Sequence, residues 1–163
     1  MSALVGIGYD SHRLVAGRPL VIGGVELEHD EGLDGHSDAD VLAHAITDAL
    51  LGAAGLGDIG EHFPDSDERW RDADSMALLA HVLALLDSDG LELVNVDCTI
   101  VMERPKLGPR RAEIRSSLAA ALRLDERRVN VKASTGERIG FVGRGEGVAA
   151  LAVASVRERD APA

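Results

Sequence analysis

The sequence predicts an α+β domain in which a mixed β-sheet carries packed helices on one face. Segments with the composition of strands interleave with segments that have the 3.6-residue periodicity of helices. The chain has 163 residues, which suits one domain, and 45% of them are hydrophobic, enough for a sizeable core. Only 2% are aromatic, so aliphatic side chains must fill that core. We expect a single domain over residues 1–156 and a frayed tail over residues 157–163.

The N-terminal part predicts a strand and a small hairpin ahead of the first helix. Ala3–Tyr9 is an apolar run typical of a strand. Leu20–Ile22 and Val25–Leu27 flank a Gly-Gly pair, which is the turn chemistry of a tight hairpin. Gly57–Asp74 is rich in glycine, proline, aspartate and serine and shows no periodicity, so we expect a loop there.

The first helix is predicted from Ser37 to about Ala54. Its apolar side chains recur at i, i+1, i+4, i+5, i+8 and i+9, so they form one stripe. Ser37 and Asp40 match a capping box at the start, and Gly55 follows the last turn. The helix is therefore expected to bury one face on the sheet and to leave the opposite face polar.

The second half of the chain continues the alternation. Ser75–Asp87 is a second amphipathic helix, and Pro109–Leu122 is a third with proline in its first turn. Strands are predicted at Leu93–Met102, Val129–Ala133 and Val148–Val156, which are apolar and rich in β-branched residues. Because strands and helices interleave, the expected architecture is a mixed sheet with helices packed on it.

The charge balance and the apolar runs exclude two classes of partner. The chain carries 17 basic and 28 acidic side chains, a net charge of −11, which argues against a nucleic-acid groove. No apolar run approaches the length of a membrane span, and Met1–Tyr9 lacks the pattern of a secretory signal. The single cysteine, Cys98, cannot form an internal disulfide and lies in an apolar run. We therefore expect a cytoplasmic protein without nucleic-acid or membrane partners.

Asp10, His12 and His44 carry the strongest chemical signal. A strand sends residues i and i+2 to the same face, so Asp10 and His12 can reach one ion. His44 shares the polar face of the first helix with Asp40 and Asp48. Three such ligands leave a fourth position open, as in catalytic zinc sites, and Asp48 is placed to orient the His44 ring. Spacing alone does not separate this site from a strand that ends in a turn beside a solvated histidine.

His36 and Ser37 precede the first helix, where they indicate an anion site. Free backbone N–H groups and the helix dipole favour negative charge at such a position, and a phosphate there would lie near the proposed metal. Ser37 would also serve as an ordinary helix cap, and the two roles are compatible.

Two later regions have the composition of binding loops. Gly57–Asp67 is polar with an apolar centre, although an ordinary surface loop fits it equally well. Lys132–Glu137 ends a strand in hydroxyls and a carboxylate, and Glu137 is a hard oxygen ligand suited to Mg²⁺. Gly140–Gly147 is glycine-rich and offers Arg144 as a cation for an anion.

Together these strings resemble the 2-C-methyl-D-erythritol 2,4-cyclodiphosphate synthase family of the non-mevalonate isoprenoid pathway. The resemblance runs from about Gly6 to Ala152, nearly the whole chain. No single string is decisive, but their joint order and spacing is specific. The strings are Asp10–His12, His36–His44, Thr47–Ala53, Gly57–Gly60, Phe63–Asp65, Pro105–Lys106, Val129–Ala133 and Gly143–Gly147.

The resemblance implies a lyase that works as a homotrimer with active sites between adjacent subunits. Its small-molecule substrate would be 4-diphosphocytidyl-2-C-methyl-D-erythritol 2-phosphate, which the family converts to 2-C-methyl-D-erythritol 2,4-cyclodiphosphate and CMP. One zinc ion per subunit would be held by the positions that match Asp10, His12 and His44. A second ion, Mg²⁺ or Mn²⁺, would be held by the substrate diphosphate and Glu137.

The resemblance also implies roles for other residues. His36 and Thr135 match catalytic positions that stabilise the transition state. The methylerythritol phosphate is assigned to residues 58–60 and 63–67, and the cytidine to residues 102–108 of the neighbouring subunit. The residues implied to contact the substrate are Asp10, Ser11, His12, His36, Ser37, Asp58, Ile59, Gly60, Phe63, Pro64, Asp65, Ser66, Asp67, Met102, Glu103, Arg104, Pro105, Lys106, Leu107, Gly108, Ser134, Thr135, Gly136, Glu137, Phe141 and Arg144.

The sequence departs from the family pattern at two positions. Members commonly have a hydroxyl residue where this chain has Gly136, which removes one hydrogen-bonding group beside Thr135 and Glu137. Some members have an acidic residue at the trimer axis where this chain aligns Leu151, so no ligand is assigned to that cavity.

Two other functions fit part of the pattern. A zinc-dependent phosphoesterase would use the same ligands but would place solvent oxygen in its product. A non-catalytic trimeric protein that binds nucleotides or isoprenoids would bind ligand without turnover. The complete set of Asp10, His12, His44 and Glu137 argues against the second alternative, and neither alternative explains all of the strings.

Overall fold

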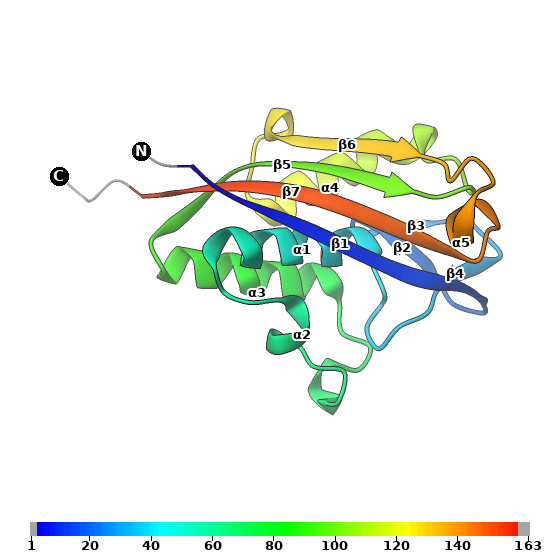
Figure 1. The fold of residues 1–163 in the computed structure, drawn as a ribbon, viewed down its shortest axis with the longest axis horizontal. Coiled ribbons are helices and arrows are strands. Elements are labelled where there is room, and N and C mark those ends of the chain that lie inside the picture. Colours follow the sequence, from blue (N-terminus) through cyan, green and yellow to red (C-terminus); the bar gives the residue numbers. More distant parts are fainter. Residues whose placement is uncertain (1–2, 160–163) are drawn as a thin grey trace.

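The computed structural model describes residues 3–159 and contains a five-stranded mixed sheet in the order β4-β1-β7-β5-β6 (Figure 1). Its strands are β1 (Ala3–Ala16), β4 (Glu31–Leu33), β5 (Leu91–Val101), β6 (Val129–Ser134) and β7 (Gly147–Glu158). The pairs β1–β4, β1–β7 and β5–β7 are antiparallel, whereas β5 and β6 are parallel. The predicted hairpin of β2 (Leu20–Ile22) and β3 (Val25–Leu27) forms a separate two-stranded sheet.

Three long helices form a layer against this sheet (Figure 1). They are α1 (Val41–Ala54), α3 (Ser75–Ser88) and α4 (Arg111–Leu122). Helix α1 packs on β1 and β7, α3 contacts α1 and β5, and α4 contacts α3 and β6. The remaining helices are α2 (Ile59–His62), α5 (Gly140–Gly143) and the 3₁₀ turns η1 (Glu68–Trp70), η2 (Gly108–Arg110) and η3 (Glu126–Arg128). The predicted single-domain α+β fold is confirmed.

Two glycines of β1 bring α1 unusually close to the sheet. A Cβ atom built on Gly6 would lie 2.0 Å from the carbonyl oxygen of Ala49, and one on Gly8 would lie 1.8 Å from that of Ala45. Both distances are far below van der Waals contact, so only glycine allows the helix backbone to lie against the strand at these points. Because strand residues alternate between faces, Asp10 and His12 continue the same helix-facing row.

The opposite face of β1 and β7 is apolar and open to solvent in the single chain. Val5, Ile7 and Tyr9 of β1 are 64%, 72% and 55% exposed, and Ile7 stands opposite Val153 of β7. Leu151, which pairs with Tyr9, belongs to the same surface. A contiguous apolar surface of this kind indicates a site of contact with another protein surface.

The first helix begins four residues later than predicted, so the proposed capping box at Ser37 is wrong. Asp40 is the N-cap, and its carboxylate accepts hydrogen bonds from the N–H groups of Ala43, Gly23 and Gly24. It is therefore fully buried between the helix and the β2–β3 turn and does not lie on the polar helix face. Ser37 lies outside the helix, where its Oγ accepts from the N–H of Ala39.

The strand boundaries also differ from the prediction at both ends of the chain. β1 continues seven residues beyond Tyr9, because residues 10–13 remain paired with β7 and residues 14–16 pair with β4. β7 continues through Arg157 and Glu158, so the predicted start of the tail at residue 157 is too early. The rest of that predicted tail, residues 160–163, lies outside the described residues. Within residues 3–159, no helix combines the length and apolarity needed to cross a bilayer.

Candidate metal centre and substrate site

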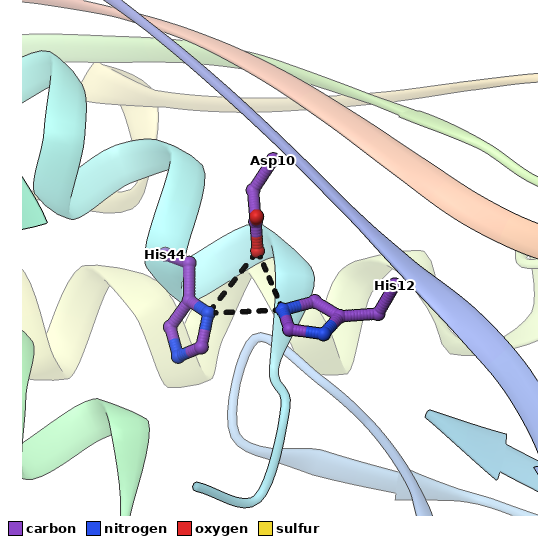
Figure 2. Close-up of side chains that lie close together, drawn as sticks. All are labelled: Asp10, His12 and His44. Carbon is purple, nitrogen blue, oxygen red and sulfur yellow. Dashed lines mark hydrogen bonds and ion pairs between the residues drawn. The ribbon is translucent and has the colours of Figure 1, made fainter. Parts of the chain in front are cut away.

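Asp10, His12 and His44 meet at one point between β1 and α1 (Figure 2). Asp10 Oδ2 lies 2.8 Å from His12 Nε2 and 3.1 Å from His44 Nδ1, and the two histidine nitrogens are 3.2 Å apart. The side chains are 26%, 17% and 12% exposed, respectively. The predicted convergence of a strand end and a helix face is therefore present, and the three residues form a possible metal site.

The donor atoms of this cluster fit a divalent metal ion. Zinc binds histidine nitrogen and carboxylate oxygen at 2.0–2.2 Å, so tetrahedral ligand atoms lie roughly 3.3 Å from each other. The three separations of 2.8, 3.1 and 3.2 Å are close to that spacing. Two nitrogens and one oxygen are also a donor set that borderline metals accept.

Each histidine has its second ring nitrogen held outside the cluster. His12 Nδ1 lies 2.7 Å from the carbonyl oxygen of Asp34, and His44 Nε2 lies 2.8 Å from the hydroxyl of Ser75. The prediction that Asp48 orients the His44 ring is wrong. The Asp48 carboxylate instead accepts a hydrogen bond of 2.9 Å from the N–H of Ile59, so it anchors the start of α2.

The cluster shifts the protonation of its own members. Burial raises the pKa of Asp10, but the hydrogen bonds from His12 and His44 outweigh this and lower the pKa from 3.8 to about 2. Burial lowers the pKa of His12, but its hydrogen bond and charge interaction with Asp10 raise it above the usual 6.5. Both shifts favour the ionised form of Asp10 and the protonated form of His12 more than in the free amino acids, so a metal ion competes with a proton for the His12 nitrogen.

A cavity of about 390 Å³ opens beside the cluster. It gathers eight of the residues predicted to contact the substrate, together with His44, the third predicted metal ligand. The predicted residues that line it are Asp10, His12, His36, Ser37, His44, Ile59, Gly60, Phe63 and Asp65. Gly35, Trp70 and Leu78 also line it and carried no signal in the sequence, because the packing of separate segments brings them there.

The loop around this cavity is held by its own acidic residues. Asp58 caps α2 through the N–H of Glu61, and Asp67 caps η1 and forms an ion pair with Arg69. Phe63 packs edge-on against Trp70, with ring centroids 4.9 Å apart. Gly57–Asp74 was predicted to be a loop, but these caps turn parts of it into short helices. The carboxylates of Asp58 and Asp67 thus already have partners within the protein, whereas Asp65 and Ser66 are exposed.

Thr135 and Glu137 do not line the cavity of the metal cluster. The Thr135 hydroxyl donates to Glu137 Oε1 at 3.1 Å, and Glu137 and its neighbour Arg138 have left-handed backbone conformations, with φ of 51° and 63°. Glu103 stabilises this turn, since its Oε1 accepts from the N–H of Gly136 at 2.7 Å and of Arg138 at 3.4 Å. Side chains of Thr135 and Glu137 therefore lie on a separate, well-defined turn.

Close packing explains why position 136 of this chain is a glycine. A Cβ atom at this position would lie 2.6 Å from the backbone nitrogen of Gly143 and 3.0 Å from its Cα. The hydroxyl residue expected here from the family pattern would therefore need a different local backbone. Gly136 thus permits the close packing of the 134–138 turn against α5.

A wide groove of about 1150 Å³ lies next to this turn. It is lined by Glu103, Arg104, Pro105, Lys106 and Arg144 among the predicted residues. The guanidinium of Arg144 pairs with Glu146 at 2.8 Å, so it already has an acidic partner.

The remaining residues predicted to contact the substrate differ in exposure. The side chains of Met102 and Leu107 are buried in the hydrophobic core, and Pro64 is half-buried, whereas Gly108 and Ser134 are exposed. Ser11 and Phe141 line a smaller hollow of about 210 Å³ together with His12. His12 therefore contributes both to this hollow and to the cavity of the metal cluster.

Fold and site together define a single-domain α+β protein with a possible divalent-metal centre at the wall of a cavity. Residues 3–157 match the model of the YgbB family, and the chain belongs to that family. Two curated relatives named 2-C-methyl-D-erythritol 2,4-cyclodiphosphate synthase are each 58% identical. The protein of Geobacillus kaustophilus aligns over 91% of this chain and 94% of its own, and that of Geobacter sulfurreducens over 95% and 99%. The predicted family, and with it the prediction of an enzyme, is confirmed.

Solved structures agree with this assignment. A CDP-bound structure of a 2C-methyl-D-erythritol-2,4-cyclodiphosphate synthase is 40% identical, with a TM-score of 0.87, over 94% of this chain and 99% of its own. The bifunctional IspDF protein of Campylobacter jejuni is 45% identical, with a TM-score of 0.94. That alignment covers 98% of this chain but only 43% of the bifunctional one, so this chain spans less than half of that protein.

Proposed function

We propose that this chain converts 4-diphosphocytidyl-2-C-methyl-D-erythritol 2-phosphate to 2-C-methyl-D-erythritol 2,4-cyclodiphosphate and CMP. The observation that carries the proposal is the Asp10–His12–His44 cluster at the wall of a cavity, in a chain 58% identical to synthases of that product. In this reaction the 2-phosphate oxygen attacks the β-phosphorus, the bond to the bridging oxygen breaks, and CMP leaves with that oxygen.

We further propose zinc at the Asp10–His12–His44 cluster and Mg²⁺ or Mn²⁺ at Glu137. The nitrogen and oxygen donors of the cluster suit zinc, and a lone carboxylate that shares an ion with phosphates suits Mg²⁺. When bound, the two ions would offset phosphate charge and orient the diphosphate. The formal net charge of −11 explains why such cations are needed at an anionic substrate.

The protein's own residues would position the substrate rather than react with it. His36 and Ser37 lie beside the cluster in the cavity, where they can donate hydrogen bonds to phosphate oxygens. Residues 58–60 and 63–67 would receive the methylerythritol phosphate, since Ile59, Gly60, Phe63 and Asp65 line the same cavity. Folding a flexible anion back onto its own diphosphate requires such fixed positioning, because entropy and repulsion oppose it.

We propose that the active enzyme is a homotrimer in which each site combines residues of two subunits. Thr135, Glu137 and the groove at residues 103–106 lie apart from the metal cluster within one chain, so a second chain can supply them. The exposed apolar face of β1 and β7 offers a surface for that assembly. Cytidine would then bind at residues 102–108 of the neighbouring subunit, with Thr135 as a catalytic group.

The direct test is incubation of the purified protein with the cytidyl substrate and Mg²⁺, followed by phosphorus NMR. The cyclic diphosphate and CMP are the expected products. Repeating the reaction in ¹⁸O-labelled water separates the reactions, because a cyclisation incorporates no solvent oxygen. Linear phosphates that carry ¹⁸O would instead identify a phosphoesterase. Binding of the substrate without any product would contradict both the cyclase and the phosphoesterase.

A further inference from the structure

A chain of three polar groups leads away from the metal cluster through His44. His44 Nε2 lies 2.8 Å from Ser75 Oγ, and Ser75 is completely buried. The Ser75 hydroxyl donates a short hydrogen bond to Asp38 Oδ1, and the Ser75 N–H donates to Asp38 Oδ2 at 3.1 Å. The metal-binding, substrate-binding and catalytic roles proposed above involve neither Ser75 nor Asp38.

The direction of these hydrogen bonds places a proton on His44 Nε2. An ionised carboxylate can only accept, so the Ser75 hydroxyl gives its proton to Asp38. The Ser75 oxygen then accepts from His44 Nε2–H, so Nδ1 is the nitrogen that faces Asp10 and His12 and would offer its lone pair to a bound metal ion. Ser37 Oγ, 3.2 Å from the same Nε2, adds a second hydroxyl to this side of the ring.

The hydrogen bonds between His44, Ser75 and Asp38 join three separate parts of the fold. His44 is on α1, Ser75 is the first residue of α3, and Asp38 belongs to the segment between β4 and α1. The backbone ties the same parts together, since the N–H of Asp38 donates to the carbonyl of Ala73 at 3.1 Å. Asp38 Oδ1 also accepts from the N–H of Asp40, the cap of α1, at 3.1 Å. The ring of His44 is thus held against two rigid helix starts.

We propose that Ser75 and Asp38 are positioning residues that hold His44 in the tautomer and orientation for metal binding. The inference rests on the proposed metal site at Asp10, His12 and His44. His12 receives the equivalent support from the carbonyl oxygen of Asp34, a backbone atom that no side-chain substitution removes. Partners of this kind raise the basicity of a histidine ligand and fix its ring. His44 is therefore the ligand whose support can be tested by substitution.

The test compares zinc affinity in the variants Ser75→Ala and Asp38→Asn with that of the intact protein. Affinity is measured by competition with a chromogenic chelator, and Co²⁺ absorption reports the ligand geometry. We expect zinc binding to weaken about 10- to 100-fold in Ser75→Ala, with an altered Co²⁺ spectrum. Asp38→Asn keeps the volume of the side chain and is expected to weaken zinc binding less than Ser75→Ala does. Ser88→Ala is the matched control, because Ser88 lies on the same helix but is exposed and bonds only to Ala84.

A purely structural role for Ser75 predicts a different result. Melting temperatures are measured with and without zinc, and a positioning role reduces the increment that zinc adds, because weaker binding gives less stabilisation. A structural role would lower both melting temperatures and leave the increment unchanged. Turnover that falls at low zinc and recovers at saturating zinc would support positioning, whereas a loss that zinc does not restore would contradict it.

The outcomes also separate this inference from the metal proposal itself. Wild-type zinc affinity and an unchanged Co²⁺ spectrum in Ser75→Ala would overturn the positioning role while the metal site stands. An intact protein that binds no zinc would overturn both. Should Ser75→Ala fail to fold, as judged by circular dichroism, Asp38→Asn decides alone, and wild-type affinity in that variant would overturn the inference.

Discussion

The proposed active site has two parts, the Asp10–His12–His44 cluster and the turn that carries Thr135 and Glu137. A single chain already assembles the first part but leaves the second part open. The metal cluster is largely shielded from solvent, its three donor atoms are already 2.8–3.2 Å apart, and both histidine rings are held from behind. The turn that carries Thr135 and Glu137 is open, and Glu137 is exposed. Order at that turn comes from local hydrogen bonds to Thr135 and Glu103.

The difference has a physical origin in the way each half is built. The cluster sits where glycines let α1 lie directly on β1, so tight packing fixes the relative positions of a strand and a helix. In the turn at residues 134–138, by contrast, Ser134, Glu137 and Arg138 are exposed, and two of the residues have left-handed conformations. The first region is a preformed candidate metal site, and the second is a surface that we propose contributes to the site of a neighbouring subunit.

Removing a cluster ligand should produce the largest effect. We expect Asp10→Ala or His44→Ala to lower turnover by about 1000-fold or more and to abolish zinc binding, because two ligands cannot hold the ion. The proposed trimer should still form, since these side chains lie on the helix side of β1 and not on the exposed sheet surface. Elemental analysis, activity and light scattering measure the three quantities. Asp89→Ala, an exposed aspartate at the end of α3, is the control; full activity in zinc-free Asp10→Ala would contradict the role.

Disrupting the apolar sheet surface should prevent subunits from associating but should leave the metal cluster of each chain intact. Ile7 is 72% exposed in the single chain, so Ile7→Glu should leave the fold intact but place a charge in the proposed subunit contact. We expect monomers by light scattering, retained zinc, and activity reduced by about 100-fold or more. A monomeric variant with full activity would refute active sites shared between subunits. Ala80→Glu introduces the same charge at an exposed position on α3, away from the apolar sheet surface, and serves as the comparison.

Removing the charge of Glu137 should lower activity without changing zinc binding at the Asp10–His12–His44 cluster. We expect Glu137→Gln to reduce turnover by about 100-fold and to raise the Mg²⁺ concentration needed for half-maximal rate, because an amide binds Mg²⁺ more weakly than a carboxylate. Zinc content should equal that of the intact protein, since Glu137 lies outside the cluster. An unchanged Mg²⁺ dependence would remove Glu137 from the second ion site. Glu158→Gln, an exposed glutamate at the end of β7, is the control.

Much of this architecture could be predicted because its signals are local. The β2–β3 hairpin has the predicted bounds, since a Gly-Gly turn between short apolar runs specifies it without help from the rest of the chain. The convergence of Asp10, His12 and His44 followed from the alternation of a strand and one helix position. The start of α1 could not be predicted, because Asp40 is fixed by Gly23 and Gly24, which lie 17 and 16 residues earlier.

The supporting groups of the site were harder to find for the same reason. Asp48 is one turn from His44 in sequence and was the natural partner, yet Ser75, 31 residues away, faces the ring. A buried serine at a helix start gives no signal in a sequence until α3 is placed against α1. Glu103 was expected to contact substrate, and its hydrogen bonds to the 136–138 backbone indicate a supporting role that only the folded chain reveals.

The smallest predicted effect on activity comes from removing the Glu103 side chain, which supports the 136–138 backbone. Glu103→Ala removes the acceptor for the N–H groups of Gly136 and Arg138, so the left-handed backbone at Glu137 and Arg138 loses its brace. We expect activity to fall about tenfold, which corresponds to about 1.4 kcal/mol in the activation barrier. Zinc affinity should not change, and Glu103→Gln, which keeps an acceptor oxygen, should recover most of the activity. If Glu103 instead contacts substrate through its charge, Glu103→Gln will be as impaired as Glu103→Ala, with the loss appearing in KM rather than in the Mg²⁺ dependence.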